Sequence, residues 1–127
     1  IMEASIKDLN PYFKSVIEQD RAPVVICDLE HIILYMNPSA MENYSKYGGG
    51  ELVGKSLLDC HNSRSCEKIT EVVGWFGESK ENNIMHTFYN RKRNKDVYMV
   101  ALRDGSGRLI GYYEKHEDRT CESERGC

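Results

Sequence analysis

Apolar residues at helical spacing begin the chain and predict an amphipathic helix. The recurring positions are Ile6, Leu9, Phe13, Val16 and Ile17. Asn10 as the cap and Pro11 in the first turn are typical of a helix start, so we expect the firm helix over 11–19 and its end by Pro23.

Two short apolar runs follow, and the pattern changes from helical to extended. Residues 24–28 and 32–36 flank a short turn, which predicts a β-hairpin. The second strand ends at Asn37, and either Asn37 or Ser39 can cap a short helix after it. Short helical turns are expected over 51–58, after a run of three glycines.

The second half of the chain predicts one long helix and a group of strands. The helix begins near Ser63 or Ser65, carries an apolar stripe and ends at Gly77. Extended runs follow at 84–89, 97–102 and 109–113. The middle run is apolar on both faces, as in a central strand, and from Glu114 onward charged residues indicate a strand end and then a tail. Strands at both ends with helices between them predict an α+β fold with one antiparallel sheet.

Length and charge restrict the possible partners. A chain of 127 residues suits a single domain. With 17 basic and 20 acidic residues the net charge is −3, so no broad positive field exists to hold a nucleic-acid backbone. The longest apolar run, 32–36, is far shorter than the roughly 20 residues of a membrane span. We therefore expect neither nucleic acid nor a membrane as a partner.

The cysteines bear on location and on redox chemistry. The five cysteines include no C-x-x-C pair and no secretion signal precedes them, which predicts reduced thiols and a cytoplasmic protein. Cys60, His61 and Cys66 are soft ligands, but zinc sites usually use two paired clusters, so no metal site is expected. Cys60 and Cys66 bracket a helix start whose dipole lowers thiol pKa values, so a thiol redox switch is an alternative function.

Catalytic motifs are missing from the sequence. The glycines at 48–50 lack the Lys-Ser/Thr that follows them in a phosphate-binding loop, and there is no Gly-x-Ser-x-Gly elbow. Cys60 and His61 are adjacent, a spacing that hinders their facing each other as nucleophile and base. We therefore expect that the protein is not an enzyme.

The order of elements and four short stretches resemble a PAS domain over residues 20–117. The stretches are 22–28 (APVVICD), 33–40 (ILYMNPSA), 51–57 (ELVGKSL) and 104–111 (DGSGRLIG). In PAS sequences these are the first strand with its turn aspartate, the second strand ending in Asn-Pro, the turn before the connector helix, and the last hairpin. Residues 59–62 (DCHN) resemble a bacterial PAS group with a Cys-His pair in the connector.

The resemblance implies a five-stranded antiparallel sheet with helices on one face and a small-molecule pocket between them. It divides the chain into an N-terminal helix (1–19), a sensory domain (20–117) and a charged tail or linker (118–127). It also implies signal transduction to a fused or separate output protein, and a homodimer formed through the N-terminal helix. An alternative interpretation is that this helix folds back on its own sheet. The alternative function is a ligand-free protein–protein interaction module.

The implied pocket would be mostly apolar with a few polar groups. For each of its residues the alternative role is plain core packing, and for Asn37 it is fixing the strand-to-helix turn. The expected lining residues are Ile26, Leu34, Met36, Asn37, Leu58, His61, Ile69, Val72, Phe76, Met85, Phe88, Tyr98 and Val100.

The resemblance leaves the cofactor unknown. In photosensory flavin members a reactive cysteine follows the turn at the place of Leu57, which has no thiol, so flavin–thiol photochemistry is disfavoured. In haem members the iron ligand is a histidine of the connector helix. His61 lies about one turn ahead of that place, which makes it the candidate haem ligand of a lesser alternative, with Cys66 as a weaker one.

Overall fold

The computed structural model describes residues 7–120, which form a curved sheet with helices against one of its faces. The helices are α1 (Asn10–Glu18), α2 (Pro38–Asn43) and α3 (Ser63–Glu78), with short 3-10 turns at Ser45–Tyr47, Gly49–Leu52 and Leu57–Cys60. The strands are β1 (Val24–Asp28), β2 (Ile33–Met36), β3 (Ile84–Asn90), β4 (Lys95–Arg103) and β5 (Leu109–Asp118).

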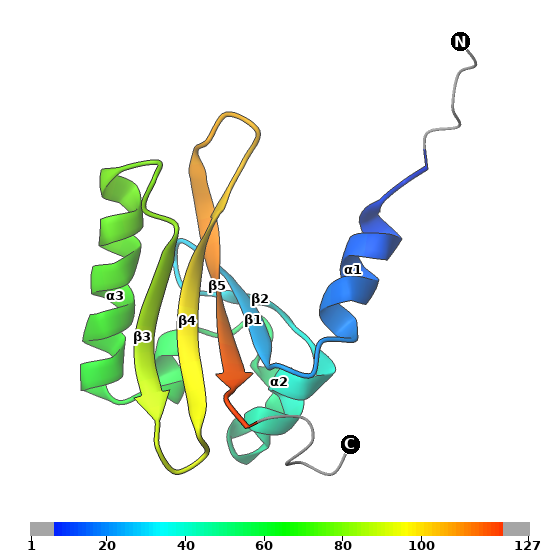
Figure 1. Cartoon of the computed structure of the whole chain (residues 1–127), viewed down its shortest axis with the longest axis vertical. Helices are drawn as coiled ribbons and strands as arrows, with labels where there is room; N and C mark the ends of the chain where they lie inside the picture. The colour runs from blue at the N-terminus through cyan, green and yellow to red at the C-terminus, as the bar shows by residue number, and fades with distance from the viewer. Residues whose placement is uncertain (1–6, 121–127) are drawn as a thin grey trace.

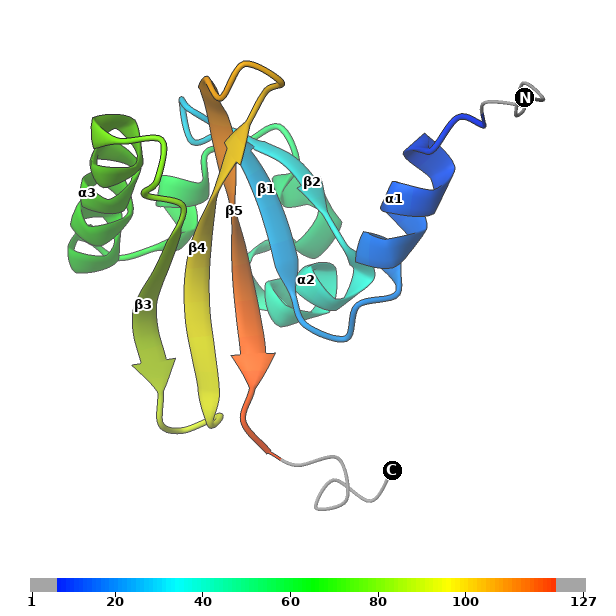
Figure 2. The same cartoon turned by 45° about the horizontal axis from the view of Figure 1, so that its top comes forward.

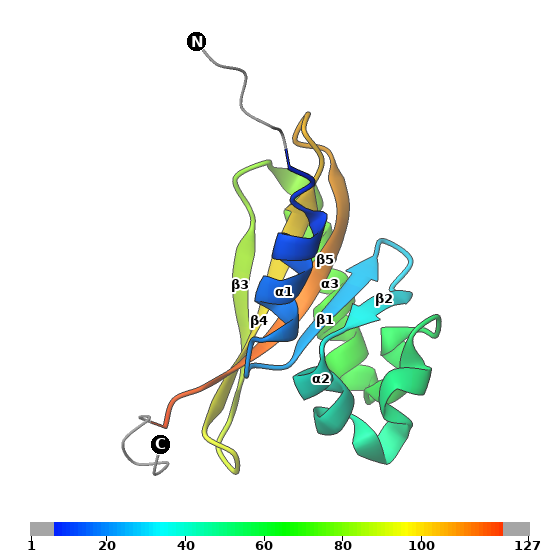
Figure 3. The ribbon, with the colours of Figure 1, turned by 90° about the vertical axis from the view of Figure 1, so that its right-hand side faces the viewer.

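The sheet has five strands in the order β2-β1-β5-β4-β3, and every pair is antiparallel. The last strand therefore lies in the middle, between the first strand and the β3–β4 hairpin (Figure 1). Viewed from the side, α2, the short turns and α3 lie on one side of the sheet (Figure 3). This arrangement confirms the predicted α+β fold, its five-stranded antiparallel sheet and its helical layer.

The core lies between the sheet and this helical layer. On the sheet side, Val25 and Cys27 of β1, Met99 of β4 and Tyr112 of β5 are at most 1% exposed. These residues occupy alternate positions, as strand geometry requires of side chains that share one face. The helical layer completes the cluster with Ala40, Tyr44, Leu52, Leu57, Ile69, Val72 and Phe76.

Helix α1 stands apart from this core, beyond the β2 edge (Figures 1 and 2). None of its residues is buried. Its C-terminal end is attached through two side chains: Asn37 Nδ2 donates to Ile17 O at 3.0 Å, and the Tyr35 hydroxyl donates to Glu18. The expected cap was wrong by one position, because Leu9 caps α1 and its side chain makes no capping bond.

The last strand is longer than its sequence pattern predicts. The predicted strand stopped at 113, but β5 continues through the charged residues to Asp118 and pairs with β4 along its length. Within residues 7–120, no helix has both the length and the apolar character needed to cross a membrane.

Candidate ligand-binding groove

A groove with a volume of about 700 Å³ opens between the start of α3 and the inner face of β3, β4 and β5; we call it the α3 groove. Helix α3 begins beside it because the Asn62 side chain caps the helix, its Oδ1 accepting from Ser65 N at 2.8 Å. The lining residues are His61, Asn62, Arg64, Ser65, Lys68, Ile69, Thr87, Phe88, Asn90, Val97, Glu114 and His116.

A buried carboxylate lines the inner end of the α3 groove. Glu114 of β5 is 4% exposed, and its Oε1 accepts from the Tyr44 hydroxyl at 2.9 Å and from His116 Nε2 at 3.2 Å. Burial alone raises the pKa of Glu114, but the hydrogen bond and charge of His116, the charge of His61 and the Tyr44 hydroxyl together hold that pKa below its ordinary value. The Glu114 carboxyl is therefore ionised at neutral pH.

The second oxygen of this carboxylate has no hydrogen-bond partner in the described part of the chain. Both side-chain hydrogen bonds of Glu114 end on Oε1, and no residue in the range 7–120 donates to Oε2. Every side-chain oxygen that is fully buried in this range has a partner, so Oε2 is not fully buried. Since Glu114 lines the α3 groove, Oε2 is an acceptor that opens into it.

The walls of the α3 groove are apolar and its rim is basic. Ile69 and Val97 are buried, whereas Phe88, on the same face of the sheet, is 58% exposed. Arg64 and Lys68 lie one turn apart on α3, and their side chains form no ion pair or hydrogen bond with any described residue. Only three of the twelve lining residues are apolar, so the groove is more polar than the pocket expected from the sequence. Its exposed aromatic side chain and its unpaired polar groups nevertheless offer both kinds of contact that a small-molecule site uses.

Comparison with known proteins assigns the family. The family model described as the PAS fold matches residues 17–124. The chain belongs to the PAS family. No curated protein sequence matches it.

Solved structures agree on the fold of this PAS domain. A PAS domain from Colwellia psychrerythraea is similar with a TM-score of 0.67 and 16% identity, covering 89% of this chain and 98% of that one. The PAS domain of Bordetella pertussis BvgS gives a TM-score of 0.62 at 16% identity, covering 94% and 92%. A C-terminal domain from Streptococcus mutans gives 0.63 at 20% identity, covering 84% and 81%. At these identities the likeness establishes the fold alone.

The PAS fold brings together part of the lining expected from the sequence. His61, Ile69 and Phe88 line the α3 groove. Five further residues of the expected set belong to the core cluster or pack against it: Met36, Leu58, Val72, Phe76 and Met85. Asn37 is fully buried, and its amide bonds only to the backbone, which confirms the turn-fixing role.

Four of the expected lining residues lie elsewhere, and their placement corrects the prediction. Ile26 pairs with Tyr35 and Tyr113, and Val100 also pairs with Tyr113, all on the sheet face opposite to the core. Tyr98 shares that outer face, where it contacts His86, while Leu34 is more than half exposed. These strands are apolar on both faces, so the sequence pattern did not indicate which alternate set points inward.

The groove residues that the sequence pattern missed are mostly polar. Glu114 and His116 fell in a charged run interpreted as a strand end and tail, and Arg64 and Lys68 lie outside the apolar stripe by which the long helix was predicted. Alternation along β5 was the available signal: Tyr112, Glu114 and His116 point inward while Lys115 points outward. The partners that make a buried carboxylate tolerable come from distant segments and leave no local pattern.

The lining of the α3 groove does not fit haem. A haem bed is apolar around the axial ligand, whereas only Ile69, Phe88 and Val97 among the lining residues are apolar, and an ionised carboxylate lies among them. His61 Nδ1 donates to Leu57 O at 2.9 Å, which leaves Nε2 without a hydrogen-bond partner among residues 7–120, so the polar lining and not the histidine disfavours haem. Within residues 7–120, no group of three His, Cys, Asp or Glu side chains is arranged to hold a metal ion.

The Cys60 thiol does not have the environment of a reactive thiolate. Burial, followed by the charges of Asp59 and Glu114, raises the pKa of Cys60, so the expected lowering by the helix start was wrong for this residue. The Cys66 thiol instead donates to Leu58 O at 3.2 Å.

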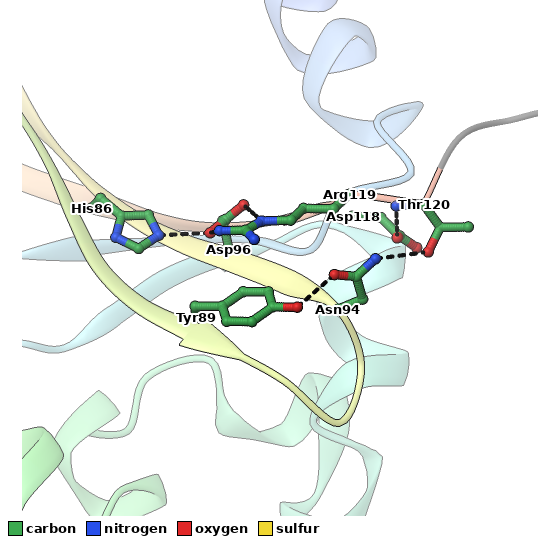
Figure 4. A network of polar contacts seen from close by, with 7 residues as sticks. All are labelled: His86, Tyr89, Asn94, Asp96, Asp118, Arg119 and Thr120. Carbon is green, nitrogen blue, oxygen red and sulfur yellow. Dashed lines mark hydrogen bonds and ion pairs between the residues drawn. The ribbon is translucent and has the colours of Figure 1, made fainter.

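A polar network on the outer face of the sheet ties the end of β5 to the β3–β4 hairpin (Figure 4). Arg119 bonds Asp96 through two nitrogens, Nε to Oδ2 at 2.6 Å and Nη2 to Oδ1 at 2.8 Å, and its guanidinium lies 3.9 Å from the Tyr89 ring centroid. His86 Nε2 bonds the same carboxylate at 2.7 Å. The hydrogen bonds from Arg119 and then His86 lower the pKa of Asp96 to about 2, so this carboxylate is ionised across the physiological pH range.

Proposed function

We propose that this PAS domain is a sensory unit of signal transduction that binds a small molecule in the α3 groove. The observation that carries the proposal is the groove itself, with Phe88 exposed on its wall and Glu114 Oε2 open at its inner end. PAS domains are generally regulatory rather than catalytic. We infer the same of this one, acting in the cytoplasm on a fused or separate output protein.

Strand β3 offers a route for the signal. Thr87 and Phe88 line the α3 groove, while His86 and Tyr89 belong to the network that holds Arg119. A ligand that shifts β3 therefore acts on the contacts at the end of β5, where the chain leaves the sheet. A ligand changes the population of two packings only through different contacts in each, and β3 supplies those contacts.

Filling the α3 groove should abolish ligand binding without unfolding the domain. In a thermal-shift screen of a metabolite library, a ligand at a hundred times its Kd adds about 2.7 kcal/mol of stability, which raises the Tm by several degrees. We expect the Ser65→Trp variant, whose new side chain occupies the groove, to lose these shifts. Ser63→Trp, on the same helix but outside the groove lining, should keep them. A library without any hit, or hits that Ser65→Trp retains, would contradict the proposed ligand site.

Helix α1 supports homodimerisation as part of this function, and as the whole function if no ligand exists. Four apolar side chains of the cap and the helix recur at helical spacing and are each more than half exposed, whereas Ile17 is partly buried. The four are Leu9, Tyr12, Phe13 and Val16. An apolar stripe of this size on an isolated helix is typical of an interaction surface, and a second copy of the chain offers a matching stripe.

Replacing Phe13 with glutamate should weaken the dimer, because a charge would have to be buried in the apolar stripe. We expect Phe13→Glu to raise the dimer dissociation constant at least about tenfold, measured by sedimentation velocity over a concentration series. Lys14→Glu, which changes charge on the opposite side of the same helix, should leave it nearly unchanged. A wild-type chain that sediments as a monomer throughout would exclude the homodimer.

A further inference from the structure

The unpaired oxygen of Glu114 restricts the chemistry of a ligand in the α3 groove. The Glu114 side chain is 5% exposed, so its carboxylate is almost removed from bulk water. Oε1 already accepts from Tyr44 and His116, whereas Oε2 has no donor among residues 7–120. An ionised carboxylate with one oxygen unpaired in such a place is stabilised by a donor and destabilised by another acceptor.

The residues around the inner end of the groove indicate what kind of ligand would carry such a donor. Ile69 and Val97 form the buried apolar walls, and Phe88 presents a face that a flat or chain-like apolar body would cover. Covering Phe88 contributes hydrophobic free energy, and an aromatic body adds ring stacking. The nearest imidazoles make no hydrogen bond to Oε2: His116 Nε2 bonds Oε1, and His61 is held through Nδ1 by the Leu57 carbonyl.

We propose that Glu114 anchors the N–H donor group of a ligand whose apolar body lies against Ile69, Val97 and Phe88. The donor is a protonated amine or the N–H edge of a heteroaromatic ring. Both offer the same hydrogen bond to Oε2. A ligand that places a carboxylate or phosphate against Oε2 is disfavoured because two anions would meet there, whereas an anionic group at the opposite end of the ligand can lie at the rim beside Arg64 and Lys68. This inference rests on the proposed function, because it names the ligand class of the same groove.

Two matched pairs of probes separate this chemistry from simple hydrophobic binding. The first pair is 2-phenylethylamine, which carries an ammonium group, and 3-phenylpropionate, which carries a carboxylate on a similar apolar body. The second pair is benzimidazole and 1-methylbenzimidazole, which differ in the N–H alone. Amide resonances of the ¹⁵N-labelled chain are titrated with each probe at neutral pH. We expect the donor of each pair to shift resonances around Phe88 and Val97 and to bind at least about tenfold more tightly than its twin. The donor that binds more tightly, 2-phenylethylamine or benzimidazole, shows whether the ligand class is an amine or a heteroaromatic ring.

Substitution of the anchor tests Glu114 directly. In Glu114→Gln the oxygen toward Tyr44 is retained, while the group toward the groove becomes an amide that donates. We expect this substitution to weaken the binding of the donor probes about ten- to hundredfold. It should also narrow the difference in affinity between the two members of each pair. Glu117→Gln removes an exposed carboxylate from the same strand and should leave the affinity of every probe unchanged. If Glu114→Gln does not fold, two other measurements test the proposal. The first is the difference in affinity within each probe pair for the wild-type chain, and the second is the loss of donor-probe affinity in Phe88→Ala, which alters an exposed side chain of the groove.

The outcomes distinguish this inference from the proposed function. Equal affinity within the pairs, tighter binding of 3-phenylpropionate, or unchanged donor affinity in Glu114→Gln would overturn the role of Glu114. Failure of both donors to shift groove resonances would overturn it too. If the metabolite screen still yields hits that Ser65→Trp abolishes, the groove remains a ligand site of different chemistry and only the anchor is lost. If that screen also yields nothing, both proposals fail.

Discussion

Replacing Gly111 with alanine should destabilise the protein by at least about 3 kcal/mol. Gly111 lies in the central strand β5, paired with Asp28 of β1 and Leu102 of β4. A Cβ at this position would lie 2.3 Å from Cys27 O and 3.4 Å from the Asp28 Cα. Both obstacles are backbone atoms held by the sheet, so relief requires the strands to separate. Urea unfolding followed by circular dichroism measures the loss.

Gly105→Ala is the matched control for this prediction. Gly105 lies in the turn between β4 and β5, and a Cβ there meets nothing within 4 Å. The same methyl group is therefore added to the same hairpin without a clash, and we expect a change within about 0.5 kcal/mol. Equal midpoints for the two variants would show that the sheet opens around a Cβ at 111 more easily than its pairing suggests. A folded Gly111→Ala variant with weaker β1–β5 pairing would also show faster amide exchange in β1.

The sequence indicated the order of elements well, but it did not indicate which face of each strand points toward the core. Four strands were located within two residues at each end, and β1 was placed at 24–28 as observed, but the end of β5 was missed by five residues. Asn37 was expected as a cap and does cap α2 through a local hydrogen bond. Helix α3 begins at Ser63, one of its two expected starts, although its cap, Asn62, was not identified. Strand β4 is apolar on both faces, so Tyr98 and Val100 looked as suited to the core as Val97 and Met99.

The groove was harder to predict because its defining residue depends on long-range contacts. Glu114 is buried only because Tyr44, 70 positions away, and His116 bond its carboxylate. In the sequence it opens a charged run, and a charged run is ordinarily solvated. The apolar part of the groove was accessible to pattern reasoning through Ile69 on the helical stripe. Its polar part required knowing that β5 continues in the middle of the sheet.

Replacing Asn37 with alanine should also cost at least about 3 kcal/mol, since it removes a helix cap and leaves buried backbone groups unpaired. Asn37 is fully buried at the end of β2. Its Oδ1 accepts from Val24 N and Ala40 N, both at 2.9 Å. Its Nδ2 donates to Ile17 O at 3.0 Å, Ala22 O at 3.0 Å and Asp20 O at 3.3 Å.

These bonds join α1, the segment before β1 and the start of α2 through one side chain. Alanine provides none of them, and no water can replace a bond in a site with no exposed surface unless the packing opens. We therefore expect two effects of Asn37→Ala: a lower unfolding free energy, and faster amide exchange in α1, because Ile17 O no longer holds its C-terminal end. Asn37→Asp would keep the two acceptor bonds, lose the three donor bonds and bury a charge, so it should be no better tolerated.

Asn62→Ala provides the comparison that isolates burial. Asn62 is also an asparagine helix cap, but it is exposed and its side chain accepts one bond, from Ser65 N. Its loss should cost about 1 kcal/mol, the ordinary value of a cap. If urea unfolding gave the same cost for both variants, Asn37 would be no more than a cap. If Asn37→Ala left amide exchange in α1 unchanged, the helix would be held by the Tyr35–Glu18 contact instead.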